Sequence, residues 1–336
     1  MRIGVVGSGA MGSLFGARLI EAGAKPEDVV LVDIDRPHIE AMQARGLIFE
    51  DGVATRQVVV NATTDHGQAG KADLIIFFCK HPQTRQAIRD AIPMMHEDTY
   101  VWTPQNGIGN VELIAEIVPA NRIAKGLTSS TSIVTAPGRI KTNFHGTTET
   151  FIWPMDGGNH PRLAEMAELL TAAGLPATLA PDIDYRIWRK LCVNTTLTAL
   201  TAAVNTAIGP IGESEAGQRL MRAIVAEVVA VANAHGIGLQ FDDAFGYVEE
   251  LREKAFEHIG STTMDMQAKR PTEIEAMCGA VAREGARLGI STPVNAVVAD
   301  IVRILEATRA QRLPVPIWRS TSATTMPKES ATTPGR

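Results

Sequence analysis

One polar stripe in this sequence combines residue types suited to proton transfer. Lys190, Asn194 and Thr198 recur at intervals of four, and most of their neighbours are apolar. Residues four apart share one face of a helix, so these side chains form a polar face on a largely buried helix. Burial lowers the pKa of a lysine, which can then donate a proton near neutral pH. The stripe indicates a general acid; the alternative is a surface lysine on an amphipathic helix.

A second polar group lies further along the chain. Ser261 and Asp265 are followed by Arg270 and by the sequence Pro271-Thr272-Glu273. We expect a helix to begin at Pro271 or Thr272, with Glu273 in its first turn. A carboxylate there is stabilised by the helix dipole. Glu273 is therefore either a site residue or a purely structural charge.

The N-terminal segment Gly7-Ser8-Gly9-Ala10-Met11-Gly12 has the spacing of a dinucleotide-binding loop. It stands between an apolar run, Arg2 to Val6, and a helical pattern from Ala10 to Ala22. The first glycine permits a tight turn, the second lets the backbone approach a pyrophosphate, and the third lets the helix pack on the strand. The helix amides and dipole then face the phosphates. An ordinary glycine turn is the alternative, which this context disfavours.

Polar residues also follow three expected strands. Asp33 ends the run from Val29, Lys80 follows the run from Leu74 to Cys79, and Asn106 follows the run from Tyr100. In doubly wound folds, ligands bind at the carboxyl ends of the strands, so all three are candidate ligand contacts. The alternatives are a surface lysine and an Asn-Gly turn.

Asp33 bears on the choice of cofactor. A carboxylate at this position can hold the adenine ribose 2′-hydroxyl and would repel a 2′-phosphate, which favours NAD. Arg36 follows closely and could instead receive that phosphate. Both could also be solvated turn charges, and the choice between NAD and NADP stays open.

The order of expected elements indicates an α/β protein. Strands alternate with helices at first, which predicts an N-terminal Rossmann-type, doubly wound sheet over residues 1–181. The strand-like stretch from Ile123 to Trp153 is expected to extend that sheet. A mainly α-helical domain is expected over residues 182–318, followed by a disordered Ser/Thr/Pro-rich tail over 319–336. Its expected helices are Ile183 to Ala207, Gln218 to His235, Phe245 to Glu257, Thr272 to Leu288 and Val294 to Arg309.

Composition excludes several classes of protein. The 336 residues are 45% hydrophobic and 21% charged, with a net charge of −5, so neither nucleic acid nor an anionic membrane is an expected partner. No apolar run approaches the ~20 residues of a membrane span. The three cysteines lack metal-site spacing, which predicts no metal and a reducing, cytoplasmic location.

Taken together, these segments resemble the ketopantoate reductases (2-dehydropantoate 2-reductases). That family has an N-terminal GxGxxG, a strand ending in lysine, a Gln-Asn-Gly turn, a Lys-Leu-x-x-Asn helix, a Ser-x-x-x-Asp segment and a Thr-Glu-Ile helix. The matching positions are Gly7–Gly12, Lys80, Gln105–Gly107, Lys190–Asn194, Ser261/Asp265 and Thr272–Ile274. The resemblance covers about residues 1 to 310 and preserves the family order.

The resemblance implies a reaction and a role for each position. The expected reaction is reduction of a small 2-oxo acid, ketopantoate, to pantoate in pantothenate biosynthesis, with NADP as the family's expected cofactor. Lys190 would protonate the ketone oxygen and Glu273 would hold the lysine and touch the cofactor or the substrate. Asn194 and Ser261 would bind substrate and Asn106 would bridge substrate and cofactor. Lys80 would reach the cofactor.

Three departures from the family pattern keep other functions open. Thr198 stands where the family usually has asparagine in the substrate pocket, Ile208 replaces a polar contact of some members, and Asp33 replaces small or basic residues. An NAD-dependent D-2-hydroxyacid dehydrogenase of the same superfamily is the first alternative. A β-hydroxyacid dehydrogenase would leave the Ser261 and Glu273 segments unexplained, and a dinucleotide-sensing regulator would not need a proton donor. A homodimer is possible.

Overall fold

A parallel sheet covered by helices forms the N-terminal half of the computed structural model, which describes residues 1–142 and 148–311. Among these residues the sheet has eight strands in the order β12-β11-β8-β7-β6-β1-β2-β5. Neighbouring strands are parallel except for one antiparallel pair, β11 with β8. The strands are β1 (Ile3–Val6), β2 (Val29–Val32), β5 (Asn61–Thr63), β6 (Leu74–Phe77), β7 (Tyr100–Thr103), β8 (Ile123–Thr128), β11 (Thr150–Pro154) and β12 (Ala177–Leu179). Every residue of β1, β2 and β6 is buried, which explains their continuous apolar runs.

A second, smaller sheet corrects the expectation for the middle of the chain. Strands β3 (Leu47–Glu50), β4 (Thr55–Val58), β9 (Ile133–Ala136) and β10 (Arg139–Lys141) form this sheet, in the order β4-β3-β10-β9. The expectation that Ile123 to Trp153 extends the main sheet holds for β8 and β11 but is wrong for β9 and β10. In β10 only Ile140 is buried, between an exposed arginine and an exposed lysine. This alternation suits a sheet with one wet face, not one covered on both faces.

Five helices of the described N-terminal half cover the sheet: α1 (Ala10–Glu21), α2 (Arg36–Arg45), α3 (Thr84–Asp90), α4 (Asn110–Ala115) and α5 (Pro161–Ala172). The first of them follows the glycine loop directly. It packs closely on the sheet, because a Cβ at Gly16 would come within 2.4 Å of the Leu31 side chain.

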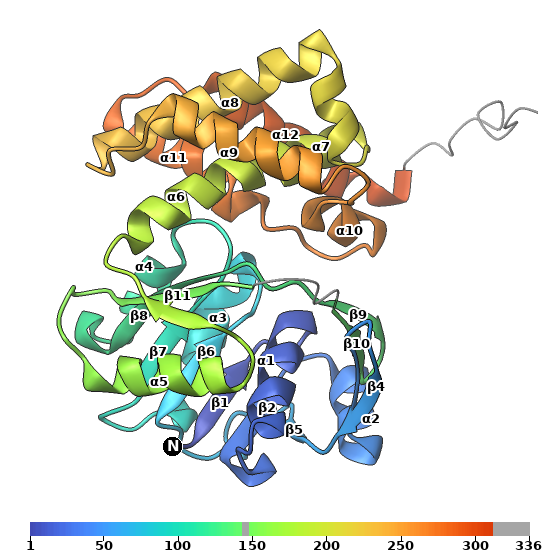
Figure 1. The fold of residues 1–336 in the computed structure, drawn as a ribbon, viewed down its shortest axis with the longest axis vertical. Helices are drawn as coiled ribbons and strands as arrows, with labels where there is room; N and C mark the ends of the chain where they lie inside the picture. Colours follow the sequence, from blue (N-terminus) through green and yellow to red (C-terminus); the bar gives the residue numbers. More distant parts are fainter. Residues whose placement is uncertain (143–147, 312–336) are drawn as a thin grey trace, which may run out of the picture.

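The C-terminal half is a layer of helices with its own hydrophobic core. It contains α6 (Ile183–Val193), a π-helical segment (Asn194–Leu200), α7 (Thr201–Val204), α8 (Glu215–Ala234), α9 (Phe241–Lys254), α10 (Ser261–Gln267), α11 (Cys278–Leu288) and α12 (Pro293–Ala307). Figure 1 shows this layer stacked on the sheet domain, with α6 between the two. The predicted class, an N-terminal Rossmann-type sheet plus a helical C-terminal domain, is confirmed. The predicted tail lies outside the described residues.

The predicted helix from Ile183 to Ala207 is interrupted by its threonines. The hydroxyl of Thr196 donates to the carbonyl of Cys192 at 2.7 Å, and that of Thr198 donates to the carbonyl of Asn194 at 2.7 Å. Such back-bonding competes with the regular helix ladder. A π-helical turn results, a feature frequent at functional sites. Within the described residues, no helix is long and apolar enough to cross a membrane.

Candidate active site

A cleft of about 1220 Å³ lies between the two halves, at the carboxyl edge of the main sheet. The predicted site residues that line it are Gly7, Gly9, Ala10, Met11, Asp33, Lys80, Asn106, Lys190, Thr198, Ser261 and Glu273. Two residues of the glycine loop do not line the cleft, because Ser8 is fully buried and Gly12 is buried within α1. Asn194 lines a small adjoining cavity together with Lys190 and Asn106. The cleft thus joins predicted site residues that are far apart in the sequence, from Gly7 to Glu273.

The glycine loop has the steric properties that a dinucleotide requires. Gly7 has φ +88°, and a Cβ there would lie 2.2 Å from the backbone nitrogen of Cys79. A Cβ at Gly12 would lie 2.4 Å from the carbonyl oxygen of Gly7. Gly9 differs, because a Cβ there would meet nothing within 4 Å. Internal packing therefore requires Gly7 and Gly12. Gly9 instead faces open space in front of a helix N-terminus, where a pyrophosphate fits.

Asp33 and Arg36 occupy different environments at the end of β2. Asp33 is half-buried, lines the cleft and accepts a hydrogen bond from the backbone nitrogen of Asp35 at 2.9 Å. Burial raises the pKa of Asp33. The side chain of Arg36 is 72% exposed and its guanidinium lies 3.7 Å from the carboxylate of Glu40. The cleft therefore presents a carboxylate at this end, while the guanidinium points to solvent on α2.

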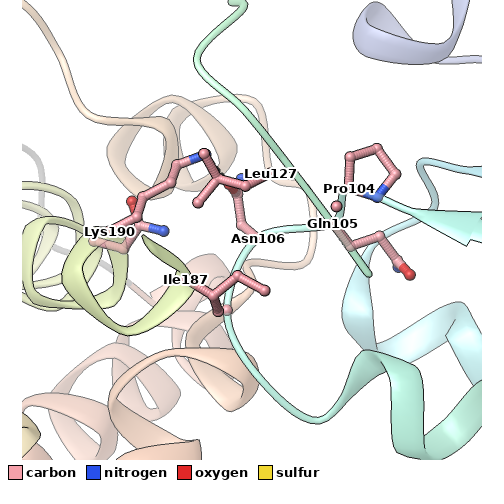
Figure 2. Close-up of a pocket in the computed structure, with 9 residues that line it drawn as sticks. Pro104, Gln105, Asn106, Leu127, Ile187 and Lys190 are labelled. Atoms are coloured by element: carbon pink, nitrogen blue, oxygen red, sulfur yellow. Dashed lines mark hydrogen bonds between the residues drawn. The ribbon is translucent and has the colours of Figure 1, made fainter. Parts of the chain in front are cut away.

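Lys190 is the charged centre of the cleft. Its Nζ donates to Oδ1 of Asn106 at 3.0 Å and to the carbonyl oxygen of Thr128 at 2.8 Å. Both acceptors belong to the N-terminal half, and Figure 2 shows Lys190 on α6 beside Asn106 from the loop after β7. Burial lowers the pKa of Lys190 to about 8, with the negative charge of Glu273 acting in the opposite direction. The lysine can consequently exchange a proton near neutral pH.

A chain of polar contacts continues from Lys190 to the other side of the cleft. Nδ2 of Asn106 donates to Oε2 of Glu273 at 3.3 Å, and Nζ of Lys80 lies 3.9 Å from the same oxygen. Lys80 also donates to Oδ2 of Asp265, whose Oδ1 accepts from Nε of Arg270 at 3.1 Å. Glu273 and Asp265 are 7% and 4% exposed, so these carboxylates are buried and paired with cations, as buried charges must be.

Three members of this network were missed as site residues from the sequence. Asp265 was part of a recognised segment, Ser-x-x-x-Asp, but received no role. Arg270 carried no signal beyond its charge. Thr128 contributes a backbone carbonyl, which no side-chain pattern can reveal.

Glu273 does not lie in a helix, contrary to the prediction. Helix α11 begins only at Cys278, after a short 3-10 turn from Ile274 to Ala276. The backbone nitrogen of Thr272 donates to Oε1 of Glu306 at 2.7 Å, and the carbonyl of Ala276 accepts from the backbone nitrogen of Ile108 at 3.0 Å. The bond to Ile108 takes the carbonyl of Ala276, which a helix through Glu273 would use internally. The irregular segment instead brings Glu273 to the cleft.

The remaining wall of the cleft mixes hydroxyl and apolar groups. Oγ1 of Thr198 donates a hydrogen bond to the carbonyl of Asn194 and accepts one from Oγ1 of Thr262 at 3.3 Å. Ser261 begins α10 beside it. Val193, Ile208 and Leu251 add aliphatic surface. The wall can therefore pack against a branched or ring-bearing small molecule, with a few polar groups to orient it.

Sequence comparisons match both halves of the chain to one family. Residues 3–154 match the family model described as ketopantoate reductase PanE/ApbA, and residues 182–306 match the model of its C-terminal part. A 2-dehydropantoate 2-reductase of Streptococcus pyogenes is 33% identical over 309 residues, covering 91% of this chain and 98% of that protein. One from Lactococcus lactis is 31% identical over 311 residues, with the same coverages.

Solved structures with a similar fold include a member of the same family. A D-mandelate dehydrogenase in complex with NADH and anilino(oxo)acetate superposes with a TM-score of 0.87 at 28% identity, covering 92% of this chain and 99% of that chain. A PanE/ApbA family ketopantoate reductase from Ralstonia eutropha superposes with a TM-score of 0.83 at 29% identity, covering 92% of this chain and all (100%) of that chain.

Proposed function

The chain belongs to the ketopantoate reductase family, and from this premise we propose that it reduces ketopantoate to pantoate with a reduced nicotinamide dinucleotide. The observation that carries the proposal is the partly buried Lys190 ammonium, with its pKa lowered to about 8, in the same cleft as the glycine loop. A proton donor at that place suits reduction of a carbonyl group, because the oxygen becomes an alkoxide as hydride arrives.

Each side chain of the cleft has a proposed task in this reaction. The reduced nicotinamide, when bound, supplies the hydride. Lys190 donates its proton to the ketone oxygen, and Asn106 and the carbonyl of Thr128 hold the ammonium in place. Glu273 keeps the lysine protonated, because its negative charge raises the lysine pKa against the effect of burial. Lys80 neutralises negative charge beside Glu273 and reaches towards the cofactor.

The proposed substrate contacts are the polar groups around Lys190. Asn194 lies one helical turn further along and adjoins the lysine in the small cavity. Ser261 and Thr198 line the main cleft. We assign to Asn194, Ser261 and Thr198 the binding of the hydroxyl and carboxylate groups of the substrate.

Turnover and binding measured on the same protein test this proposal. Purified enzyme should oxidise reduced cofactor when ketopantoate is added, and Lys190→Ala should lower kcat by roughly 10²- to 10⁴-fold while cofactor still binds. Lys254→Ala is a matched control, because that lysine pairs with Glu250 on its own helix, α9, outside the cleft, and should leave kcat unchanged. Absence of turnover with either cofactor in a folded protein would contradict the proposed reaction.

We propose NADH as the preferred cofactor. Asp33 places a carboxylate in the cleft at the end of β2, and Arg36 forms its contact with Glu40 outside the cleft. A carboxylate can accept a hydrogen bond from a ribose 2′-hydroxyl but repels a 2′-phosphate. The D-mandelate dehydrogenase with the similar fold was solved with NADH. The ratio of kcat/KM for NADH to that for NADPH measures the preference.

A second candidate function is an NAD-dependent D-2-hydroxyacid dehydrogenase. The aliphatic wall formed by Val193, Ile208 and Leu251, next to Thr198, favours a more apolar 2-oxo acid than ketopantoate. The similarity to D-mandelate dehydrogenase supports the same candidate function. A kcat/KM for 2-oxo-isocaproate or a phenyl-substituted 2-oxo acid well above that for ketopantoate would favour this candidate.

Location and assembly are proposed on separate grounds. The three cysteines, Cys79, Cys192 and Cys278, are buried and free, which supports the reducing environment of the cytoplasm. Pairing of two copies through the helical half is supported by exposed apolar residues on α12, Val297 and Ile304. Sedimentation of the purified protein measures the assembly state.

A further inference from the structure

His38 on α2 is a buried histidine whose two ring nitrogens are both engaged. It is 2% exposed. Its Nδ1 accepts a hydrogen bond from the backbone nitrogen of Gly138, in the turn between β9 and β10, at 3.0 Å. Its Nε2 lies 3.2 Å from Oγ of Ser13 on α1, and that hydroxyl donates to the carbonyl oxygen of Ser8 at 2.7 Å. His38 thus links the small sheet to the glycine loop.

The polarity of these bonds fixes the protonation state of His38. A backbone N–H can only donate, so Nδ1 carries no hydrogen. Ser13 gives its hydroxyl proton to Ser8, so its oxygen accepts from Nε2. His38 is therefore neutral, with its one ring hydrogen on Nε2.

The chain of hydrogen bonds from His38 through Ser13 ends at the Ser8 carbonyl and so orients the peptide bond between Ser8 and Gly9. In a trans peptide the C=O of one residue and the N–H of the next point in opposite directions. Because the Ser8 carbonyl faces inward to Ser13, the N–H of Gly9 faces the other way. Gly9 lines the cleft, and a Cβ there would meet nothing within 4 Å. This N–H stands directly before α1, where helix amides receive phosphates.

We propose that His38, in its neutral form, is a positioning residue for the dinucleotide, which it serves by holding the Gly9 N–H towards the cofactor phosphates through Ser13 and Ser8. The proposal rests on the proposed dinucleotide binding. A proton added at Nδ1 would turn the acceptor for Gly138 into a second donor, so the bond between the turn and the ring would be lost. The glycine loop would then lose its support, and cofactor affinity would fall in acid.

The surroundings of His38 agree with a neutral ring. Burial lowers its pKa below the ordinary 6.5, while Asp35, Asp33 and the Ser8 carbonyl act in the opposite direction. Two arginines on the neighbouring elements have partners other than His38. Arg45 donates to the carbonyl of Pro137 at 2.7 Å, and Arg139 of β10 pairs with Glu50. Protonation of His38 is therefore expected only at a pH more acidic than that at which an ordinary histidine titrates.

Cofactor binding measured without turnover tests the proposal. The dissociation constant for NADH is determined by fluorescence titration between pH 5 and 8 for the wild type, His38→Phe, Ser13→Ala and His38→Gln. We expect His38→Phe and Ser13→Ala to bind about tenfold more weakly at pH 8, as loss of one buried hydrogen bond implies. Glutamine can still donate to Ser13 but cannot titrate, so His38→Gln should stay within about threefold of the wild type at pH 8.

The pH profile separates positioning from a merely structural role. Wild-type affinity should weaken as the pH falls from 8 to 5, whereas His38→Gln should weaken much less. Asp33 and His66 also line the cleft and are present in every variant, so the difference between the two profiles reports the contribution of residue 38, including its coupling to Asp33. His96→Gln is the control, because His96 pairs with Asp73, away from the cleft, and should follow the wild type throughout.

Two results would overturn the proposal. One is equal pH dependence in the wild type and His38→Gln; the other is unchanged affinity at pH 8 in both Ser13→Ala and His38→Phe, with melting curves showing folded proteins. Failure of ketopantoate turnover would not affect this test, because it measures binding alone. Absence of both NADH and NADPH binding in the wild type would overturn this proposal together with the dinucleotide binding on which it rests.

Discussion

The lowered pKa of Lys190 predicts how the rate of ketone reduction depends on pH. Reduction requires the ammonium form as proton donor, and oxidation of the alcohol requires the neutral amine. With a pKa of about 8, kcat for reduction should be constant below pH 7 and fall above pH 8. The oxidation rate should rise over the same range.

The magnitude follows from the titration curve. With a pKa of about 8, roughly 90% of Lys190 is protonated at pH 7, about half at pH 8 and about 10% at pH 9. Reduction should therefore be about tenfold slower at pH 9 than at pH 7. A fall in pKa from 10.5 to about 8 also means that the protein disfavours the ammonium form by about 3 kcal/mol. Lys190→Met should accordingly raise the free energy of unfolding at pH 7 while abolishing turnover.

The assay compares the wild type with Glu273→Gln in steady-state and single-turnover experiments. Loss of the Glu273 charge removes the factor that raises the lysine pKa, so the alkaline limb should move to lower pH. Single-turnover rates are needed, because product release can mask the chemical step. Glu275→Gln is a matched control, since that carboxylate pairs with Arg283 and Arg303 outside the cleft.

Two outcomes would refute the reasoning about Lys190. A single-turnover reduction rate that stays constant up to pH 10 would show that the lysine is not the titrating donor. A limb that moves to higher pH in Glu273→Gln would show that the carboxylate does not act on the lysine charge.

Three further predictions concern the cofactor end, the ion-pair network and the junction of the two halves. Asp33→Ser should raise the ratio of kcat/KM for NADPH to that for NADH by roughly tenfold, because a repulsive charge is removed; an unchanged ratio would contradict the position assigned to Asp33. Asp265→Asn should raise KM for NADH and lower the free energy of unfolding by about 2 kcal/mol, because Lys80 and Arg270 lose their shared carboxylate. This figure is below that of a fully buried pair, because the two cationic side chains are 32% and 52% exposed. Gly107→Ala should cost about 3 kcal/mol in urea unfolding, because φ is +81° and the new Cβ would lie 2.1 Å from the carbonyl oxygen of Ala276. Gly157→Ala has a similar φ of +72° with open space, and an equal loss there would show that the close approach does not matter.

Local patterns were sufficient where the function depends on adjacent residues. The glycine loop was predictable because strand, turn and helix follow one another within about 20 residues. The positions of Asp33, Lys80 and Asn106 were predictable because the ends of parallel strands must share an edge. The polar face of Lys190 was predictable from helical spacing alone.

Long-range contacts explain what the sequence did not reveal. Glu273 was expected in a helix, but its segment uses backbone groups to bind Glu306 and Ile108. Strand β10 pairs with β3, about 90 residues away, and no local pattern selects that partner. The partners of Asp265 were equally hidden, because Lys80 lies 185 residues earlier in the chain.

The same long-range contacts make the proton donor a property of the two halves together. Helix α6 supplies Lys190, but both hydrogen-bond acceptors of its ammonium, Asn106 and Thr128, belong to the sheet domain. Separation of the halves would return the lysine to water, where its pKa would rise towards 10.5 and its proton would be held too tightly to transfer well at neutral pH. The contacts of Glu273 with Asn106 and of Lys80 with Asp265 bridge the same junction. The lowered pKa of the acid therefore depends on contact between the two halves and not on α6 alone.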